Sequence, residues 1–308
     1  MIKEFVAERA PSFYKSMHYL KMKYYLFLGK YFPKKLIEKY YFNAYKKHIN
    51  LIDPQDIDEK INWLKLYSDT TLWSKCADKE KVREYVKIKG LEDTLNDLYG
   101  IYNSPEEIPF ASLPNEFVIK TTNGGGGNSV LIIKDKKDIS IPNVKKTLYK
   151  WLKQPIGYQY AEYHYLKIRP KLIVEKYLHP NIGEKSLIDY KFNCFNGKVH
   201  SIFMCSDRDL NGHSVKYSVY DLNWELHPES IKAKYRTQKT YPKPSSLSLM
   251  IKYSEILSTG IPFVRVDWYE NGNKPIFGEM TFTPAGGFQS FYTDEFRKEL
   301  GDMLNFSK

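Results

Sequence analysis

The sequence has few cysteines and no long apolar run. Its three cysteines, Cys76, Cys194 and Cys205, are unevenly spaced and form no CxxC or cysteine–histidine cluster, which argues against a disulfide framework and a structural zinc site. The longest uncharged apolar run near the N-terminus, from Tyr24 to Gly29, is far too short to span a membrane, and no signal-peptide cleavage site accompanies it. We therefore expect a cytoplasmic protein that is neither secreted nor transmembrane.

The composition also argues against a disordered chain. Hydrophobic residues make up 42% of the 308 residues and aromatic residues 16%, against 27% charged residues. Disordered segments combine low hydrophobicity with few aromatic residues. A chain of this length can bury one large core or about two to three smaller ones. The sequence therefore predicts a folded protein, with room for several lobes.

Positive charge is concentrated in residues 1–48. This segment has eleven Lys/Arg and three Asp/Glu, a net charge of +8 out of +11 for the whole chain, and it also contains 13 Phe/Tyr residues. Lysines interleaved with aromatic residues suit contact with an anionic lipid surface, which would make the protein peripheral to the inner face of the membrane. The alternative is that the aromatic residues pack a helical lobe onto the body while the lysines stay solvated. No nucleic-acid docking motif is present, so we expect no nucleic-acid partner.

The order of elements predicts an α+β protein. The first third is mainly helical, with breaks near Gly29 and Pro33 and helices over 58–67 and 78–89. Short β-branched and aromatic runs then predict strands at 117–120, 129–133, 171–178, 189–195 and 198–204. Helical periodicity returns at 143–154 and 248–260, and a short helix follows Thr293.

The segment FVIKTTNGGGGNSVLII predicts a hairpin with a glycine tip. Its first strand ends at Lys120, and Gly124, Gly125, Gly126 and Gly127 follow. Glycines let backbone N–H groups approach phosphate oxygens, and a nearby lysine adds a positive charge. The segment is neither a Walker A loop nor a kinase glycine loop, because no Gly-Lys-Ser/Thr follows and the lysine precedes the glycines. A phosphate-covering flap is one interpretation, and a merely flexible turn is the other.

A second hairpin is predicted from FVRVDWYENGNKPIFGEMTF. If its loop centres near Asn273, Arg265 opposes Thr281 and Asp267 opposes Glu279, so that four polar side chains share one face. A two-residue turn at 271–272 would instead offset Asp267 from Glu279 diagonally. The other face is expected to carry Val264, Val266, Trp268, Ile276, Met280 and Phe282. Paired carboxylates of this kind can hold Mg²⁺ against ATP phosphates, although an exposed face with a cross-strand charge pair is the alternative.

A third segment, LIVEKYL at 172–178 followed by IDYKF at 188–192, predicts a hinge between lobes. The backbone of its Glu-Lys-Tyr-Leu stretch has donors and acceptors suited to adenine. A buried strand with a polar end would explain the same residues.

Taken together and in this order, the segments resemble the ATP-grasp ligases. More narrowly, LPNEFVIKTTNGGGGN, DYKFNCFNGK and FGEMTFTPAGGF are similar to the TupA-like ATP-grasp proteins of bacterial surface-polysaccharide gene clusters. The resemblance spans roughly residues 60–301. It implies an ATP-grasp fold with a helical N-terminal lobe (1–94), a glycine-flap subdomain (95–178) and a C-terminal metal-binding lobe (179–308).

The resemblance also implies roles for individual residues. Lys79 and Lys120 would bind phosphate, Gly124 to Gly127 would form the flap, Glu175, Lys176, Tyr177 and Leu178 would contact adenine, Asp189 would hold the ribose, Asp267 and Glu279 would bind magnesium, and Arg265 would lie beside the transferred phosphoryl group. Apart from the resemblance, SDRDLNGHS could be a loop in which Arg208 faces the ATP phosphates. Many relatives have an amide or a carboxylate where this chain has Thr281, which puts a second magnesium in doubt.

The implied activity is an ATP- and Mg²⁺-dependent carboxylate–amine ligase that forms an acyl phosphate. Its acid would be a uronic acid or an amino acid, and its product would modify a capsule or another surface polysaccharide. Two alternatives remain open. The triplet Asp207-Arg208-Asp209 is a DxD pattern of metal-dependent glycosyltransferases, and the chain could also be an ATP-binding scaffold without activity. His213 is a further candidate for substrate contact, because it follows this triplet in an expected loop.

Overall fold

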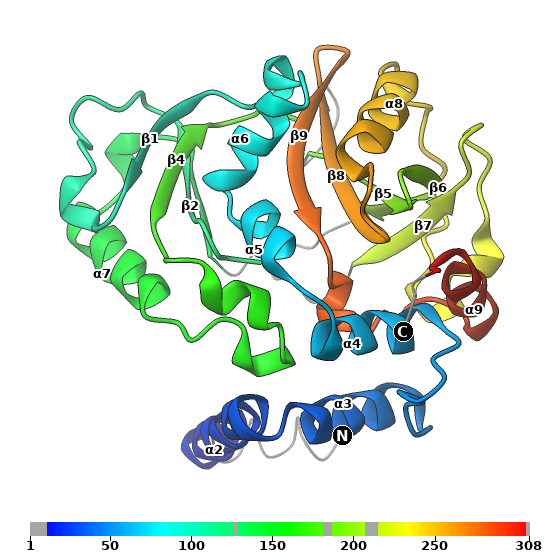
Figure 1. The fold of residues 1–308 in the computed structure, drawn as a ribbon. Coiled ribbons are helices and arrows are strands. Elements are labelled where there is room, and N and C mark those ends of the chain that lie inside the picture. The colour runs from blue at the N-terminus through cyan, green and yellow to red at the C-terminus, as the bar shows by residue number, and fades with distance from the viewer. Residues whose placement is uncertain (1–10, 126–128, 181–186, 207–214, 306–308) are drawn as a thin grey trace.

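The computed structural model describes residues 11–125, 129–180, 187–206 and 215–305. Within them the protein is an α+β structure with two antiparallel sheets that lie side by side (Figure 1). The helices are α2 (Pro11–Tyr31), α3 (Pro33–Tyr45), α4 (Ile57–Tyr67), α5 (Thr71–Ala77), α6 (Lys81–Ile88), α7 (Ile141–Leu152), α8 (Leu247–Ser258) and α9 (Asp294–Met303).

The first sheet has the strand order β1-β4-β2-β3. Its strands are β1 (Leu98–Tyr102), β2 (Phe117–Thr121), β3 (Val130–Ile133) and β4 (Leu172–Lys176). Helix α7 covers one face, where Val144 and Leu148 join Phe117, Ile119 and Val174 in a core of their own. The hairpin expected around the glycine run is therefore present as β2 and β3, which pair antiparallel.

The second sheet has the strand order β7-β6-β5-β8-β9. Its strands are β5 (Asp189–Phe195), β6 (Lys198–Ser206), β7 (Lys216–Tyr220), β8 (Phe263–Asn271) and β9 (Lys274–Thr281). Helix α8 packs on β5, β6 and β8, and helices α4 to α6 contribute Ile57, Ile61, Trp73 and Val86 to the same core. Residues 57–91 thus share a core with the C-terminal sheet rather than with the N-terminal helices.

Helices α2 and α3 form a separate layer at one edge of the molecule (Figure 1). Tyr25, Leu28, Leu36 and Ile37 turn inward and make a small core with Ala161. None of the described helices, α2 included, has the combination of length and apolar character that crossing a membrane requires.

The N-terminal helices break at one place and not at two. Helix α2 continues through Gly29 and ends at Tyr31, and α3 begins at Pro33. Gly29 serves close packing instead of a break. Its missing side chain lets the helix approach the short helix η4 (Tyr158–Tyr160), since a Cβ there would lie 1.7 Å from the Tyr158 carbonyl oxygen. Tyr163 adds a hydrogen bond of 2.5 Å from its hydroxyl to the Gly29 carbonyl.

A buried charge cluster joins α3 and α9 at the start of α4. Asp58 accepts hydrogen bonds from the Tyr45 hydroxyl at 2.5 Å and from the Gln289 backbone N–H at 3.1 Å. Arg297 lies 2.8 Å from Asp56 and 3.6 Å from Asp58, and its guanidinium stacks on Tyr45. Burial and the neighbouring Asp56 raise the pKa of Asp58 to about 6. This cluster anchors the N-terminal layer to the body.

Candidate active site

The β8–β9 hairpin sets the register of the candidate site. Its turn is Gly272-Asn273, with both residues at positive φ, and Asn271 pairs with Lys274. A regular ladder from this turn would place Asp267 opposite Gly278. A β-bulge at Gly278 shifts the register by one residue, so that Asp267 faces Glu279 and Arg265 faces Thr281.

The bulge also corrects one expectation about the other face of the hairpin. Trp268 pairs with Phe277, so Phe277 and not Ile276 lies on the core side. Gly278 is suited to this position because a Cβ there would lie 2.9 Å from the Asp267 carbonyl oxygen. The bulge turns Glu279 and Thr281 to the face that carries Arg265 and Asp267.

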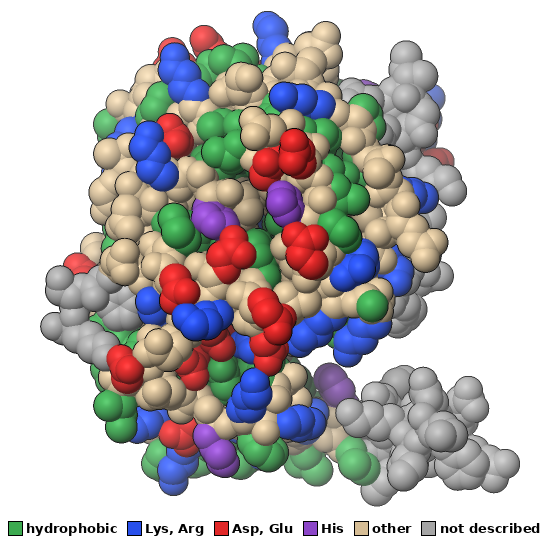
Figure 2. Space-filling model, turned by 90° about the vertical axis from the view of Figure 1, so that its right-hand side faces the viewer, with side chains coloured by type: hydrophobic (Ala, Val, Ile, Leu, Met, Phe, Trp, Pro, Cys, Tyr) green, Lys and Arg blue, Asp and Glu red, His purple; other side chains and the backbone are tan. Residues whose placement is uncertain are grey.

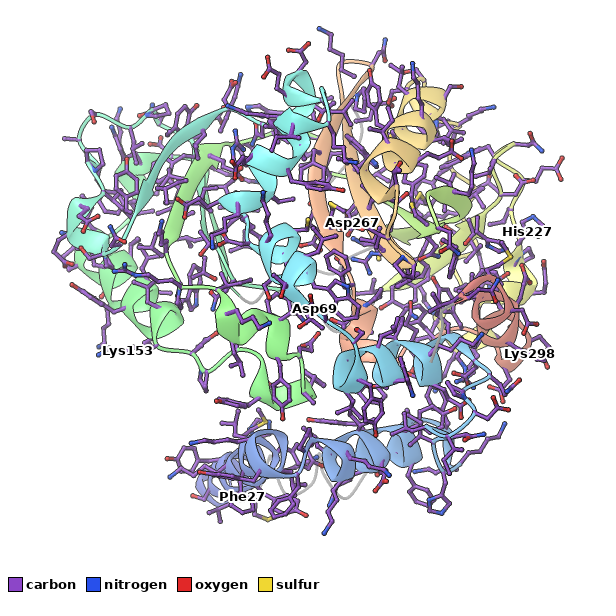
Figure 3. All side chains as sticks on the ribbon, in the orientation of Figure 1. Phe27, Asp69, Lys153, His227, Asp267 and Lys298 are labelled. Atoms are coloured by element: carbon purple, nitrogen blue, oxygen red, sulfur yellow. The ribbon has the colours of Figure 1, made fainter. Side chains whose placement is uncertain are left out.

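Asp267 lies on β8, where Figure 3 labels it, and is the centre of a dense ion-pair network. Arg265, two residues earlier on the same face, donates from Nε at 2.7 Å and from Nη2 at 2.6 Å. Arg265 Nη2 also lies 3.3 Å from the Thr281 hydroxyl and 3.6 Å from Glu279. Burial lowers the pKa of Arg265 but Asp267 raises it more, so the guanidinium stays charged.

Lys191 is a site residue that the sequence analysis missed. It lies on β5 directly opposite Asp267, and its ammonium is 2.5 Å from Asp267 and 2.7 Å from Asp189. Burial lowers the pKa of Lys191, but the two carboxylates raise it above its ordinary value. The period-two rule could have found it, because Asp189 and Lys191 are two residues apart on one strand and so share a face.

Lys79 connects the two sheets at this point. It follows Asp78, the C-cap residue of α5, and its backbone N–H donates to the Thr122 carbonyl. Its ammonium lies 2.5 Å from the Gly124 carbonyl oxygen in the flap and 4.0 Å from Glu279. Burial lowers the pKa of Lys79. The glycine segment and the carboxylates of β8–β9, which are distant in sequence, therefore meet around one side chain.

The positive charges around Glu279 keep its carboxylate ionised. Burial raises the pKa of Glu279, but the charges of Lys79, Lys191 and Arg265 lower it by more, so that it falls to about 2. The Thr281 hydroxyl also donates to Glu279 at 3.3 Å.

Lys120 lies on β2 and is paired within the first sheet. Its ammonium is 2.8 Å from Glu175, which is buried on β4, and Arg83 lies 3.2 Å from the same carboxylate. The pair holds the Lys120 side chain in one direction at the end of the strand that leads into the glycines. Glu175, predicted as an adenine contact, thus has a second role as an anchor for two cations.

The predicted hinge lies where the chain crosses from the first sheet to the second. Strand β4 ends at Lys176, and β5 begins at Asp189. Lys176 is exposed and pairs with Asp97 at 3.0 Å, whereas Tyr177 and Leu178 are half-buried. Asp189, predicted to hold the ribose, lies at the far end of this crossing beside Lys191.

Tyr165 is another residue without a sequence signal for the site. It lies on the short helix η5 (Tyr163–Lys167), and a Cβ on Gly125 would be 3.8 Å from its hydroxyl oxygen. Burial and the nearby Glu162 and Glu279 raise its pKa well above the ordinary value. Six of the residues singled out from the sequence lie outside the described residues, namely Gly126, Gly127, Asp207, Arg208, Asp209 and His213.

Comparison with known proteins decides the family. The TupA-like ATPgrasp family matches residues 59–305, which is most of the chain. The protein belongs to the TupA-like ATP-grasp family. No curated protein matches the sequence.

Solved structures similar to this TupA-like protein are ATP-grasp ligases and related synthetases. They include D-alanine–D-alanine ligase from Bacillus anthracis (17% identity, TM-score 0.47, 75% of this chain and 66% of that one). D-cycloserine synthetase DcsG has 13% identity and a TM-score of 0.43, over 77% of this chain and 73% of its own. The ATP-grasp ligase PsnB, solved with a precursor variant, Mg and ADP, has 10% identity and a TM-score of 0.42, over 80% of this chain and 65% of its own. The chain thus spans about two thirds of the length of the first of these.

The donor set of this TupA-like protein fits a magnesium ion bound together with phosphates. Asp267 and Glu279 face each other across the hairpin, and the Thr281 hydroxyl lies beside Glu279. Mg²⁺ prefers oxygen ligands and usually takes one or two carboxylates, several waters and substrate phosphates. In the part of the chain that the structure describes, no cluster of three or more His, Cys, Asp or Glu side chains could hold a metal alone.

Proposed function

We propose that the protein is an ATP-dependent ligase that joins a carboxylate to an amine through an acyl phosphate. The observation that carries this proposal is the position of Lys79, between the flap carbonyl of Gly124 and the carboxylate of Glu279. It joins a glycine segment suited to phosphates and a carboxylate face suited to magnesium into one site. Membership of the TupA-like ATP-grasp family supports the same reaction class.

In the proposed site, cations surround the phosphates. Lys79 and Lys120 neutralise the phosphate chain, with Lys120 directed by Glu175. Asp267, Glu279 and Thr281 hold magnesium, which when bound would neutralise charge on the phosphate oxygens. The glycine flap covers the phosphates and excludes water that would hydrolyse the acyl phosphate.

The remaining assignments concern the nucleoside and the reacting groups. Arg265 stabilises the charge on the transferred phosphoryl group, and Arg208, which lies outside the described residues, is a further candidate for contact with the phosphates. The backbone of the hinge binds adenine, and Asp189 binds the ribose. The residues proposed for the hinge are Glu175, Lys176, Tyr177 and Leu178.

The reaction consists of two displacements without a covalent enzyme intermediate. A carboxylate oxygen of the substrate attacks the γ-phosphorus, the bond from that phosphorus to the bridging oxygen breaks, and ADP leaves. The amine nitrogen then attacks the acyl carbon, the bond to the phosphate oxygen breaks, and the nitrogen loses a proton to solvent as phosphate leaves. The protein aligns the groups and neutralises charge, which is why the site needs no nucleophilic side chain.

For the substrates, we propose a uronic-acid-type carboxylate and an amino acid or another amine, in the synthesis of a bacterial surface polysaccharide such as a capsule. The resemblance to TupA-like proteins of such gene clusters supports this choice. The buried cations Arg265 and Lys191 suit an anionic substrate but do not distinguish one acid from another.

Thermal unfolding with Mg-ATP, Mg-ADP and UDP-sugars tests the proposal. Ligand at about 100 times its dissociation constant adds about 2.7 kcal/mol, a shift of several degrees. We expect a shift with Mg-ATP that shrinks in Lys120→Ala and in Glu279→Ala. Lys153→Ala, at the exposed end of α7 away from Asp267 (Figure 3), is the matched control and should keep the shift.

Phosphate release separates the competing functions. We expect a panel of acids and amines to include a pair that makes the protein release phosphate from ATP, and this turnover to disappear in Glu279→Ala. A thermal shift with UDP-sugars alone would favour a glycosyltransferase that uses Asp207 and Asp209. A shift with Mg-ATP without turnover on any pair would favour a scaffold.

A further inference from the structure

Helix α2 carries a continuous apolar stripe on its outer face. Spacings of three and four residues put its members on one side of the helix, and each is between 47% and 64% exposed. They are Met17, Leu20, Tyr24, Phe27 and Tyr31. Phe27 lies on the side of α2 that faces away from the two sheets (Figure 3). We call these five residues the outer stripe.

The outer stripe is not the packing face of α2. Tyr25 and Leu28 point the other way, into the small core that they form with Leu36 and Ile37 of α3 and with Ala161 of the body. Gly29 fixes this orientation, because its backbone lies against the Tyr158 carbonyl. Packing onto the rest of the protein therefore accounts for Tyr25 and Leu28, whereas the residues of the outer stripe lie outside the core.

The charge around the outer stripe is mainly positive. Residues 11–31 contain four lysines and no Asp or Glu, and α3 adds Lys34, Lys35 and Lys39 against one exposed carboxylate, Glu38. Several lysine ammonium groups lie over the exposed rings, at 4.6 Å for Lys23 over Tyr19 and 4.9 Å for Lys39 over Tyr24. On the side of the protein with β7 and α9, in contrast, acidic and basic side chains are mixed (Figure 2).

We propose that the outer face of α2 and α3 binds the anionic surface of a lipid bilayer. Aromatic and aliphatic side chains of the outer stripe would enter the headgroup region while the lysines contact lipid phosphates. Lys30 and Lys35, which lie over the rings of Tyr31 and Phe32, show the same combination at the junction of the two helices. The helices lie along the membrane surface and do not cross it.

Charge distinguishes this occupant from a second copy of the chain. The spacing of the outer stripe resembles a coiled-coil seam, and such seams are flanked by residues of opposite charge. Two α2 helices would instead bring lysines together without a carboxylate to pair with them, and like charges repel. An anionic lipid surface offers apolar contact for the outer stripe and negative charge for the lysines.

The segment against which α2 packs also reaches the candidate site. Residues 157–167 hold Gly29 at one end, through Tyr158 and Tyr163, and carry Tyr165 beside the flap residue Gly125. One short segment therefore supports both the proposed membrane surface and the flap.

Sedimentation of the full chain with lipid vesicles tests the proposal without ATP or substrate. We expect binding to vesicles of phosphatidylcholine mixed with phosphatidylglycerol, and at least about tenfold weaker binding to phosphatidylcholine alone. Lys23→Glu, at the lysine that lies over the exposed ring of Tyr19, is expected to weaken binding by about fivefold or more, since one lysine near an anionic surface has that effect. Added salt is expected to weaken binding of the unmodified protein.

The apolar part of the proposal is tested by Leu20→Ser combined with Phe27→Ser. We expect about tenfold or greater loss of vesicle binding with unchanged thermal unfolding, because both side chains are exposed. Ile88→Ser is the matched control, since Ile88 is 69% exposed at the end of α6, and it should bind like the unmodified protein.

Three results would overturn the proposal. One is absence of sedimentation with anionic vesicles. Another is a dimer, seen by sedimentation velocity, that the Leu20 and Phe27 substitutions dissociate, because the stripe would then bind a second copy. The third is a combination of two findings: the protein binds neutral and anionic vesicles equally, and it binds an acidic polymer such as heparin with an affinity that the Leu20 and Phe27 substitutions leave unchanged.

Discussion

Asp58 is expected to make the stability of the protein depend on pH. Its carboxyl group is fully buried between Tyr45, Arg297 and Gln289, and its pKa is about 6 against an ordinary value of 3.8. A shift of about two pKa units corresponds to about 3 kcal/mol. Because the folded protein holds the proton more tightly than the unfolded chain, this stabilisation is complete below about pH 4 and is lost as the pH rises through 6.

The substitution Asp58→Asn isolates this contribution. Asparagine keeps the size of the side chain and an oxygen that accepts from the Gln289 N–H, but it does not titrate. We would measure the free energy of unfolding by urea denaturation of both proteins from about pH 4 to pH 7. The value for the unmodified protein minus that for the variant is expected to fall by about 2.4 kcal/mol over this range, which begins just above the ordinary pKa.

The sign of the slope tests the reasoning. Asp56 and burial raise the pKa of Asp58, whereas Arg297 and the Tyr45 hydroxyl lower it. If Arg297 dominated, the pKa would lie below its ordinary value and the difference would rise with pH. A flat or rising difference would therefore refute the assignment of burial as the main cause.

Three further predictions concern backbone positions and a buried histidine. Gly278→Val is expected to remove the bulge that sets Asp267 opposite Glu279, and so to abolish the thermal shift with Mg-ATP; an unchanged shift would contradict this. Gly29→Ala should cost about 2 kcal/mol or more and expose α2 to limited proteolysis, because its Cβ would clash with a backbone carbonyl. Burial lowers the pKa of His164 to about 3, so its ring NMR signals should not shift between about pH 5 and 8, and a shift would show that it titrates.

The sequence predicted most elements of the fold because their signals are local. Strand β5 has the bounds that were expected, 189–195, and α4 begins one residue before the expected helix, at Ile57, where Asp56 and Glu59 form a capping box. The break expected near Gly29 was wrong, because the close contact with Tyr158 that requires this glycine is a tertiary feature. No local pattern distinguishes a glycine that ends a helix from one that allows close packing within it.

In the candidate site, too, the sequence predicted the local features but not the tertiary contacts. Period-two alternation put Arg265 and Asp267 on one face, but the register opposite them depends on the bulge at Gly278, which the sequence alone did not indicate. Lys79 and Gly124 meet because the Lys79 backbone N–H, just after α5, donates to the Thr122 carbonyl next to the glycine segment, and nothing in their spacing predicts that contact.

The ion pairs around Asp267 bear on the order in which ligands bind. Both carboxylate oxygens accept hydrogen bonds from Arg265 or Lys191, so a free cation would have to displace two positive charges from this carboxylate. A nucleotide brings several negative charges that can engage these cations as they release the carboxylate. Metal and nucleotide are therefore expected to bind with positive cooperativity, each raising the affinity for the other. In a compartment rich in magnesium, the resting protein would keep its own cations in place until the nucleotide arrives.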